Sequence, residues 1–170
     1  MQTLALLTAT TLCVRLLIPQ LSTAQQPTPP VAGTSHREGV TSRGDHAMGF
    51  SHQTTTHHFR LDKTGGVITV SANDPKDDAT RDQIRMHLSH IVKRFVAGDF
   101  DVPMFIHDTT PPGAPVMAKL REQIHYTYSD TANGGKVQIT TANSDAIQAI
   151  HDFLRFQISD HQTGDSTEVR

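Results

Sequence analysis

The sequence predicts an α+β fold in which two ββα units form a four-stranded antiparallel sheet, with the helices packed on one face. Three observations lead to this prediction. Two β-rich hairpins each contain a Gly-Gly pair, at residues 65–66 and 134–135. Each hairpin is followed by a stretch with apolar residues at helical spacing. The segments 65–73 and 134–143 also align with each other, from the Gly-Gly pair to a closing Ala-Asn, which indicates an internal repeat. A sheet covered on one face would bury both helical stripes.

The first unit begins with residues 55–61, where His57, Phe59 and Leu61 alternate with polar side chains and predict a strand. Residues 62–66 predict a turn, and the β-branched run 67–72 predicts the second strand of a hairpin. Residues 80–97 then predict a helix that ends at Gly98. Its apolar stripe consists of Ile84, Leu88, Ile91 and Phe95.

The linking segment and the second unit follow the same logic. Residues 102–106 form a short apolar run that we interpret as a strand, and residues 115–123 predict a short helix with Pro115 at its first position. Residues 125–128 and 136–142, joined by a turn at 133–135, predict the second hairpin. Ser144 is a suitable cap for a helix that extends to about residue 159. Its apolar positions are Ile147, Ile150, Leu154 and Ile158.

The chain divides into four predicted regions. Residues 1–24 resemble a secretory signal peptide, with an apolar stretch followed by the small residues Ser22-Thr23-Ala24. Residues 25–49 are rich in Pro, Thr and His and predict a disordered segment, whereas residues 50–163 predict a single α+β domain. Residues 164–170 predict a disordered tail. The expected location is therefore the periplasm or the exterior, with no membrane span after signal removal.

Composition restricts the classes of function. The net charge of −2 argues against a nucleic-acid partner, which would require a concentrated basic patch. The only cysteine, Cys13, lies in the predicted signal, so the mature chain would contain no disulfide and no thiol ligand. No protein partner is indicated.

Eleven histidines in 170 residues are the strongest functional signal. Imidazole is the commonest protein ligand for transition metals, and thioethers favour the cuprous ion. Histidines and Met48 in the segment before residue 53 strengthen this pattern. The sequence therefore predicts that the protein binds a metal ion, copper or zinc, for metal handling or resistance.

Five histidines are the predicted metal ligands. His57 shares the strand face that should meet the helices, and His87 and His90 lie three residues apart on the first long helix. His107 follows the 102–106 run and precedes a loop, where ligand groups often lie. His151 falls in the apolar stripe of the last helix, where a buried imidazole needs a partner.

Two other functions remain open at this stage. The chain has no His-Glu-x-x-His motif, no nucleotide-binding loop and no Gly-x-Ser-x-Gly elbow. A metal-free binding or interaction module is the first alternative, with the histidines as core or surface residues. A small enzyme that uses a histidine as general base, or a metal-bound water, is the second.

Several motifs resemble those of a group of small exported bacterial proteins with His/Met-rich N-terminal tails. They are Met-Gly-Phe at 48–50 with Thr-Thr-His-His-Phe at 55–59, the stretch 84–91 leading to Gly-Asp-Phe at 98–100, and Gln-Ile-Ser-Asp-His at 157–161. The resemblance covers most of residues 46–165 and implies an exported bacterial protein. Some members carry the label aspartate carbamoyltransferase, but this chain lacks the Ser-Thr-Arg-Thr-Arg phosphate loop and is far shorter than such an enzyme.

Overall fold

The computed structural model describes residues 32–170, with side chains from residue 35 onward. The predicted signal peptide, 1–24, and the first part of the predicted disordered segment lie outside the described residues. Within the described part of the chain, no helix combines the length and the apolar character that a membrane span requires.

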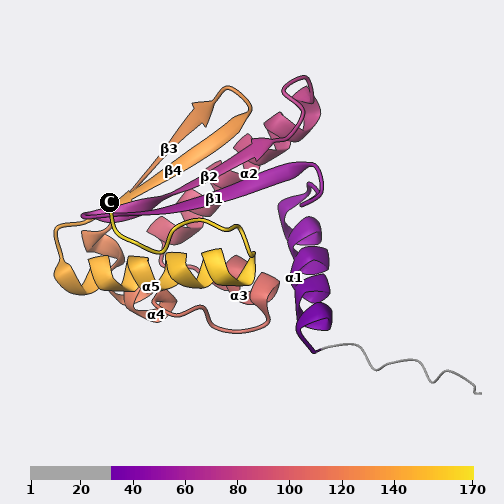
Figure 1. The fold of residues 1–170 in the computed structure, drawn as a ribbon. Coiled ribbons are helices and arrows are strands. Elements are labelled where there is room, and N and C mark those ends of the chain that lie inside the picture. The colour runs from indigo at the N-terminus through magenta and orange to yellow at the C-terminus, as the bar shows by residue number, and fades with distance from the viewer. Residues whose placement is uncertain (1–31) are drawn as a thin grey trace, which may run out of the picture.

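The predicted fold class is confirmed. Four strands form one antiparallel sheet in the order β1-β2-β4-β3, and two long helices cover one face of it (Figure 1). The strands are β1 (Thr55–Asp62), β2 (Gly65–Ala72), β3 (His125–Thr131) and β4 (Gly134–Thr140), and the long helices are α2 (Asp78–Val96) and α5 (Ser144–Asp160). The core lies between the sheet and these helices.

The two ββα units are related by an approximate twofold axis through the centre of the sheet. In the pairing of β2 with β4, Ile68 lies opposite Val137, and these two residues occupy equivalent positions counted from the two Gly-Gly pairs. Each long helix packs mainly on the strands of the other unit, with α2 on β4 and β3 and α5 on β2 and β1. Neither unit can therefore bury its helix alone.

Glycine permits this close packing at two equivalent positions. A Cβ atom at Gly66 would lie 2.3 Å from Leu154 Cδ1, and a Cβ atom at Gly135 would lie 3.0 Å from Leu88 Cδ1. Each helix thus presses a leucine against a strand that carries no side chain at the contact. The repeated Gly-Gly pairs are a packing requirement of the fold as well as a turn signal.

The buried stripes match the predicted helices. In α2, Ile84, Leu88, Ile91 and Phe95 are buried as expected. In α5, Ile150, Leu154 and Ile158 are buried, whereas Ile147 remains partly exposed. The cap of α5 is Asn143, whose side chain accepts a hydrogen bond from the Ala146 N–H, rather than the predicted Ser144.

The segment between the units differs from its prediction. Residues 102–106 lie in a short helix, α3 (Asp101–His107), and do not form a strand. Phe100, Pro103, Ile106 and His107 are buried at helical spacing, and Pro103 lies in the first turn, where its missing N–H costs nothing. The predicted helix 115–123 is divided into α4 (Ala114–Lys119) and a 3₁₀ turn, η1 (Arg121–Gln123).

The predicted disorder of 25–49 is wrong for its larger part, because a helix, α1 (Ala32–Met48), occupies it. Val40 and Met48 are buried, and α1 packs against α3 at one end of the sheet (Figure 1). The side chain of Arg43 donates a hydrogen bond to the Ile106 carbonyl, 2.9 Å away. Tertiary contacts therefore stabilise a helix whose composition is mostly polar.

The predicted disordered tail, 164–170, also adopts a definite course. Val169 forms a parallel bridge with Leu61, and the Arg170 N–H donates to the Leu61 carbonyl at 3.0 Å. Asp165 accepts a hydrogen bond from the Phe59 N–H at 2.9 Å. The tail thereby covers the free edge of β1, which would otherwise expose unpaired backbone groups.

Candidate functional site

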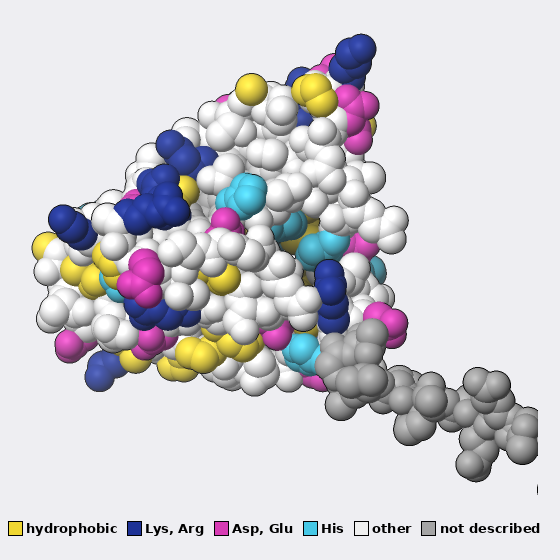
Figure 2. All heavy atoms as spheres, viewed as in Figure 1, with side chains coloured by type: hydrophobic (Ala, Val, Ile, Leu, Met, Phe, Trp, Pro, Cys, Tyr) yellow, Lys and Arg dark blue, Asp and Glu magenta, His cyan; other side chains and the backbone are white. Residues whose placement is uncertain are grey.

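Four histidines from four different elements gather beside the end of the sheet where α1 lies. We call His52, His57, His107 and His161 the histidine cluster. His57 lies on the helix-facing side of β1, as predicted, and His107 is the last residue of α3. His161 caps the C-terminus of α5, and His52 lies in the loop between α1 and β1. Figure 2 shows histidine side chains gathered around one hollow of this face.

Three rings of the cluster are mutual neighbours. Their centres are 5.3 Å apart for His52 and His57, 5.5 Å for His52 and His161, and 5.7 Å for His57 and His161. His107 meets His161 edge-on, with ring centres 5.0 Å apart. No hydrogen bond within the described part of the chain engages the rings of His57 and His161, so their nitrogen atoms have no protein partner there.

His52 is oriented by a carboxylate. Its Nδ1–H donates to Asp45 Oδ1 at 2.6 Å, and its backbone N–H donates to the same oxygen at 2.9 Å. This arrangement leaves Nε2 as the atom with a free lone pair. Nε2 is buried and has no hydrogen-bond partner among the described residues. A buried acceptor without a partner is costly in a native structure, and therefore calls for an explanation.

His107 is held on both sides. Its Nδ1–H donates to Asp160 Oδ2 at 2.5 Å, and its Nε2 lies 3.1 Å from Gln157 Oε1. The other oxygen of Asp160 accepts a hydrogen bond from His36 of α1 at 2.8 Å. Asp160 thus joins α1, α3 and α5. Reversal of the Gln157 amide, whose own nitrogen is buried without a partner among the described residues, would let that nitrogen donate to Nε2, so His107 is placed to position the cluster rather than to offer a free lone pair.

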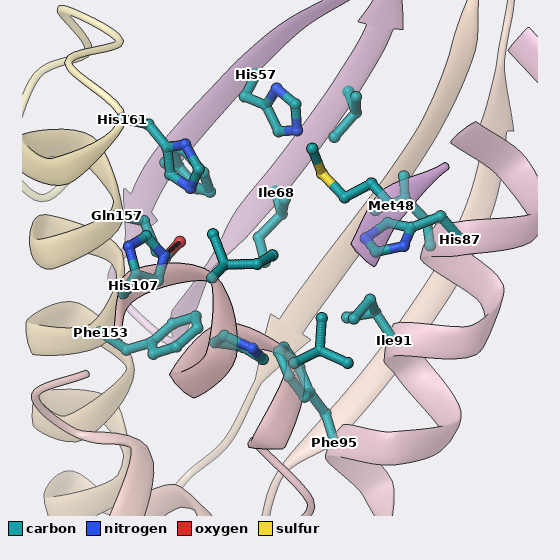
Figure 3. A pocket seen from close by; sticks show the side chains of 16 residues that line it. Met48, His57, Ile68, His87, Ile91, Phe95, His107, Phe153, Gln157 and His161 are labelled. Carbon is teal, nitrogen blue, oxygen red and sulfur yellow. Dashed lines mark hydrogen bonds between the residues drawn. The ribbon is translucent and has the colours of Figure 1, made fainter. Parts of the chain in front are cut away.

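Two cavities meet at His57 and His161. The inner cavity, of about 70 Å³, lies between the sheet, α2, α3 and α5. Figure 3 shows His57, His87, His107 and His161 around a space whose other walls are the Gln157 amide and apolar side chains such as Ile68 and Phe153. The outer cavity, of about 200 Å³, has polar walls. Its lining includes Arg37, Thr41, His52, Thr55, Asp160 and Thr163.

Burial disfavours the protonated form of three of the imidazoles that line the cavities, those of His57, His87 and His161. It lowers the pKa of His161 to about 3, helped by the neighbouring His107 and His52, and it lowers the pKa of His87 to about 4. Burial and the adjacent His161 also lower the pKa of His57 well below its usual value. Near neutral pH each of these rings therefore carries a free lone pair, which is the form that binds metal ions.

Hydrogen bonds keep the two supporting carboxylates ionised. Burial alone would raise the pKa of Asp160, but the hydrogen bonds from His107 and His36 outweigh it and lower that pKa. In the same way, the hydrogen bonds from His52 outweigh burial and lower the pKa of Asp45. Two negative charges therefore flank the histidine cluster without lining the inner cavity.

The structure brings three of the five sequence-predicted ligands together and leaves two apart. His57, His87 and His107 all line the inner cavity. His90 is exposed on α2. His151 is buried, but its Nε2–H donates to the carbonyls of Asp62 and Gly65, at 2.9 and 3.1 Å, on the far side of the core. His151 is thus a core histidine with its hydrogen bonds satisfied.

Sequence reasoning missed His52 and His161 as candidates. Both lie outside the strands and long helices, where periodicity gives no information about direction. One signal was available for His161: it follows Leu154 by seven residues, so continuing the stripe of α5 by one turn would have placed it on the buried face.

As they are placed, no three His, Cys, Asp or Glu side chains within the described residues form a group that could hold a metal ion. Comparison with known proteins gives no further information on function. No family model matches the chain, and no curated protein or solved structure was found to be similar to it.

Proposed function

We propose that this protein binds a transition-metal ion, copper or zinc, at the histidine cluster, with His52, His57 and His161 as the ligands. The observation that carries the proposal is the mutual proximity of these three rings, with centres 5.3 to 5.7 Å apart. Three imidazoles around one tetrahedral ion, with metal–nitrogen distances of about 2.0 Å, have ring centres roughly 5 Å apart. Binding would require the rings to turn so that one nitrogen of each faces the common centre.

The surroundings of His52 support the same proposal. A metal-binding histidine usually donates its other N–H to a carboxylate, which fixes the tautomer and increases the basicity of the ligating nitrogen. Asp45 occupies that position beside Nδ1, while Nε2 is buried without a partner. A bound ion would satisfy this nitrogen.

A fourth position remains for solvent or an exchanging ligand. The outer cavity reaches His52, His57 and His161 from the polar side and provides room for it. A site with three protein ligands and an open position suits uptake and release of an ion as well as catalysis. We propose metal handling or resistance in an exported bacterial protein, in accord with the predicted signal peptide.

Metal titration of the untagged chain tests this function. The zinc affinity would be measured at pH 7.5 by competition with a chromogenic chelator. We expect one zinc ion per chain, and we expect His57→Gln to weaken binding by more than about tenfold because it removes a ligand. His58→Gln is the matched control, since His58 is the next residue of the same strand but points to the opposite, exposed face.

The role of Asp45 is tested separately. Asp45→Asn should weaken zinc binding by about tenfold, because it removes only the partner of His52. Zinc binding that is equal in the wild type and in a combined His52→Gln/His57→Gln/His161→Gln variant would refute the proposed site. The folded state of each variant would be checked by circular dichroism.

A metal-free binding module is the second candidate. The inner cavity has mostly apolar walls with imidazoles on one side, a combination that suits a small apolar molecule with one polar group. Stabilisation of the protein against heating by such a molecule, together with indifference to copper and zinc, would favour this candidate over the first.

A further inference from the structure

The inner cavity contains a soft ligand in addition to its histidines. Met48, the last residue of α1, is buried and lines this cavity together with His57 and His87. Figure 3 shows its thioether between the rings of these two histidines. The ring of Phe50 lies beside both histidines, with its centre 6.2 Å from that of His57 and 5.6 Å from that of His87.

From this arrangement we infer a second metal position, on the inner side of His57, where Met48, His57 and His87 bind a cuprous ion. The inference rests on the proposed metal-binding function and assigns the identity of the ion. Because the two positions share His57, the chain holds one ion at a time, either on the outer side with His52 and His161 or on the inner side with Met48 and His87.

Ligand softness separates the two positions. Thioether sulfur prefers soft, monovalent copper, whereas zinc is satisfied by imidazole and oxygen. Met48 supplies the only sulfur among the residues that line the inner cavity, and the outer cavity has hydroxyl and carboxylate walls in its place.

The charge of the bound ion also distinguishes the inner metal position from the outer one. The residues that line the inner cavity include no Asp, Glu, Lys or Arg, and apart from its histidines and the Gln157 amide its walls are apolar. Three neutral ligands leave the full charge of the ion in a poorly solvated space. That desolvation penalty grows with the square of the charge, so a monovalent ion is tolerated much better than a divalent one. The outer cavity is polar, with both Asp160 and Arg37 on its wall and Asp45 beside His52, so a divalent ion loses less solvation there.

The remaining methionines provide a matched control. Met117 in α4 is fully buried but does not line the cavity. Replacing either residue by Leu keeps the volume and the apolar character nearly constant, so the structural effects of the two substitutions should be similar and small. Only Met48→Leu removes a ligand.

The test compares cuprous and zinc affinities of three proteins: wild type, Met48→Leu and Met117→Leu. Cuprous ion would be supplied anaerobically with ascorbate and a competing chromogenic chelator. We expect Met48→Leu to lose about tenfold or more in cuprous affinity while its zinc affinity is unchanged, and we expect Met117→Leu to resemble the wild type in both. His87→Phe should also weaken cuprous binding alone.

A spectroscopic measurement makes the ligand visible. In protein labelled at the methionine methyl carbons, silver ion, a redox-inert substitute for the cuprous ion, should shift the resonance that Met48→Leu removes. Equal cuprous affinities of Met48→Leu and Met117→Leu, or an unmoved Met48 resonance with silver bound, would overturn the inner position. Zinc binding that depends on His52 and His161 would then leave the proposed function intact, whereas its absence would overturn that function independently.

Discussion

Where α2 of the first unit packs on β3 of the second, Phe95 lies against Tyr126, with ring centres 5.8 Å apart. Where α5 of the second unit packs on β1 of the first, the equivalent positions are occupied by His161 and His57, 5.7 Å apart. The equivalence follows from the repeat, because His57 and Tyr126 pair with equivalent residues of β2 and β4. Phe95 and His161 each follow the leucine that contacts a glycine by seven residues.

The two ring pairs differ in what they contribute to the stability of the fold. The aromatic pair Phe95 and Tyr126, with Phe100 beside it, buries mainly apolar ring surface, although the Tyr126 hydroxyl has no hydrogen-bond partner among the described residues. The histidine pair places two basic rings in the equivalent position, and because burial lowers the pKa of both rings it makes the fold sensitive to acid. Departures of this kind are expected at functional sites, where stability is exchanged for chemistry. The comparison therefore supports a packing role at one end of the sheet and agrees with the proposed metal binding at the other.

The largest effect on stability should come from two equivalent leucines, one in each long helix. Leu88→Ala and Leu154→Ala each remove a buried side chain that packs on a glycine, and each should lower the free energy of unfolding by about 2–5 kcal/mol. Urea denaturation at pH 7.5 would measure both. Losses that differ by more than about 2 kcal/mol would show that the packing of the two units is not equivalent.

The next largest effect on stability should come from His57 and His161, where the two equivalent ring pairs differ. We expect the double substitution His57→Phe/His161→Phe, which places an aromatic pair where α5 packs on β1, to abolish metal binding and to stabilise the protein in mild acid. The adjoining inner cavity gives space for the larger rings. At pH 5 the gain in free energy of unfolding should approach roughly 2 kcal/mol for His161, less the effect of residual solvent exposure, and the replacement of His57 should add to it in the same direction.

The sign follows from the lowered pKa values. The unfolded chain protonates these histidines near pH 6.5, whereas burial lowers the pKa of His161 in the folded state to about 3. Above pH 6.5 both states are neutral and nothing is lost, but as the pH falls below 6.5 only the unfolded chain takes up protons. Wild-type stability should therefore fall from pH 6.5 toward pH 4, and the double variant should show a flatter profile. Parallel profiles would contradict this account.

The sequence predicted the fold well because the fold depends on local patterns. The Gly-Gly pairs, the alternating strand residues and the stripe from Ile84 to Phe95 each report on their own element, and the repeat then dictates how the elements pair. The direction of His57 followed from parity with Phe59 in the same way. Its meeting with His87 and His107 in one cavity depends on the packing of β1, α2 and α3, which no local pattern specifies.

Helix α1 and the tail were missed for a different physical reason. Both are polar segments whose order comes from a few long-range contacts, such as that of Arg43 with the Ile106 carbonyl and that of Asp165 with the Phe59 N–H. Composition predicts disorder for such segments, since it counts apolar residues and cannot see these partners. Val40, Ala47 and Met48 do recur at helical spacing, and they were the one usable signal for α1.

A smaller effect on stability is expected for Asp160, whose carboxylate joins α1, α3 and α5. Asp160→Asn removes the charged acceptor of His107 and His36, and should cost about 1.5 kcal/mol at pH 7. Because the pKa of Asp160 is lowered in the folded protein, this contribution is present above about pH 4 and is lost as the pH falls through the folded value. Asp152→Asn is the control, since Asp152 lies on the solvent-exposed side of α5 and bonds only to neighbours on that helix.

The smallest effect should come from α1, which has no counterpart in the second unit. His36 is about half exposed, with 49% of its side-chain surface accessible, and it reaches the rest of the molecule through Asp160 alone. His36→Ala should therefore cost less than about 1 kcal/mol, as exposed ion pairs usually do. Hydrogen exchange offers a sharper measurement, because a loosened α1 would lose amide protection while α5 keeps it. Equal loss of protection in α1 and α5 would mean that α1 is an integral part of the core. The two ends of the sheet would then differ in the helices that support them as well as in their histidines.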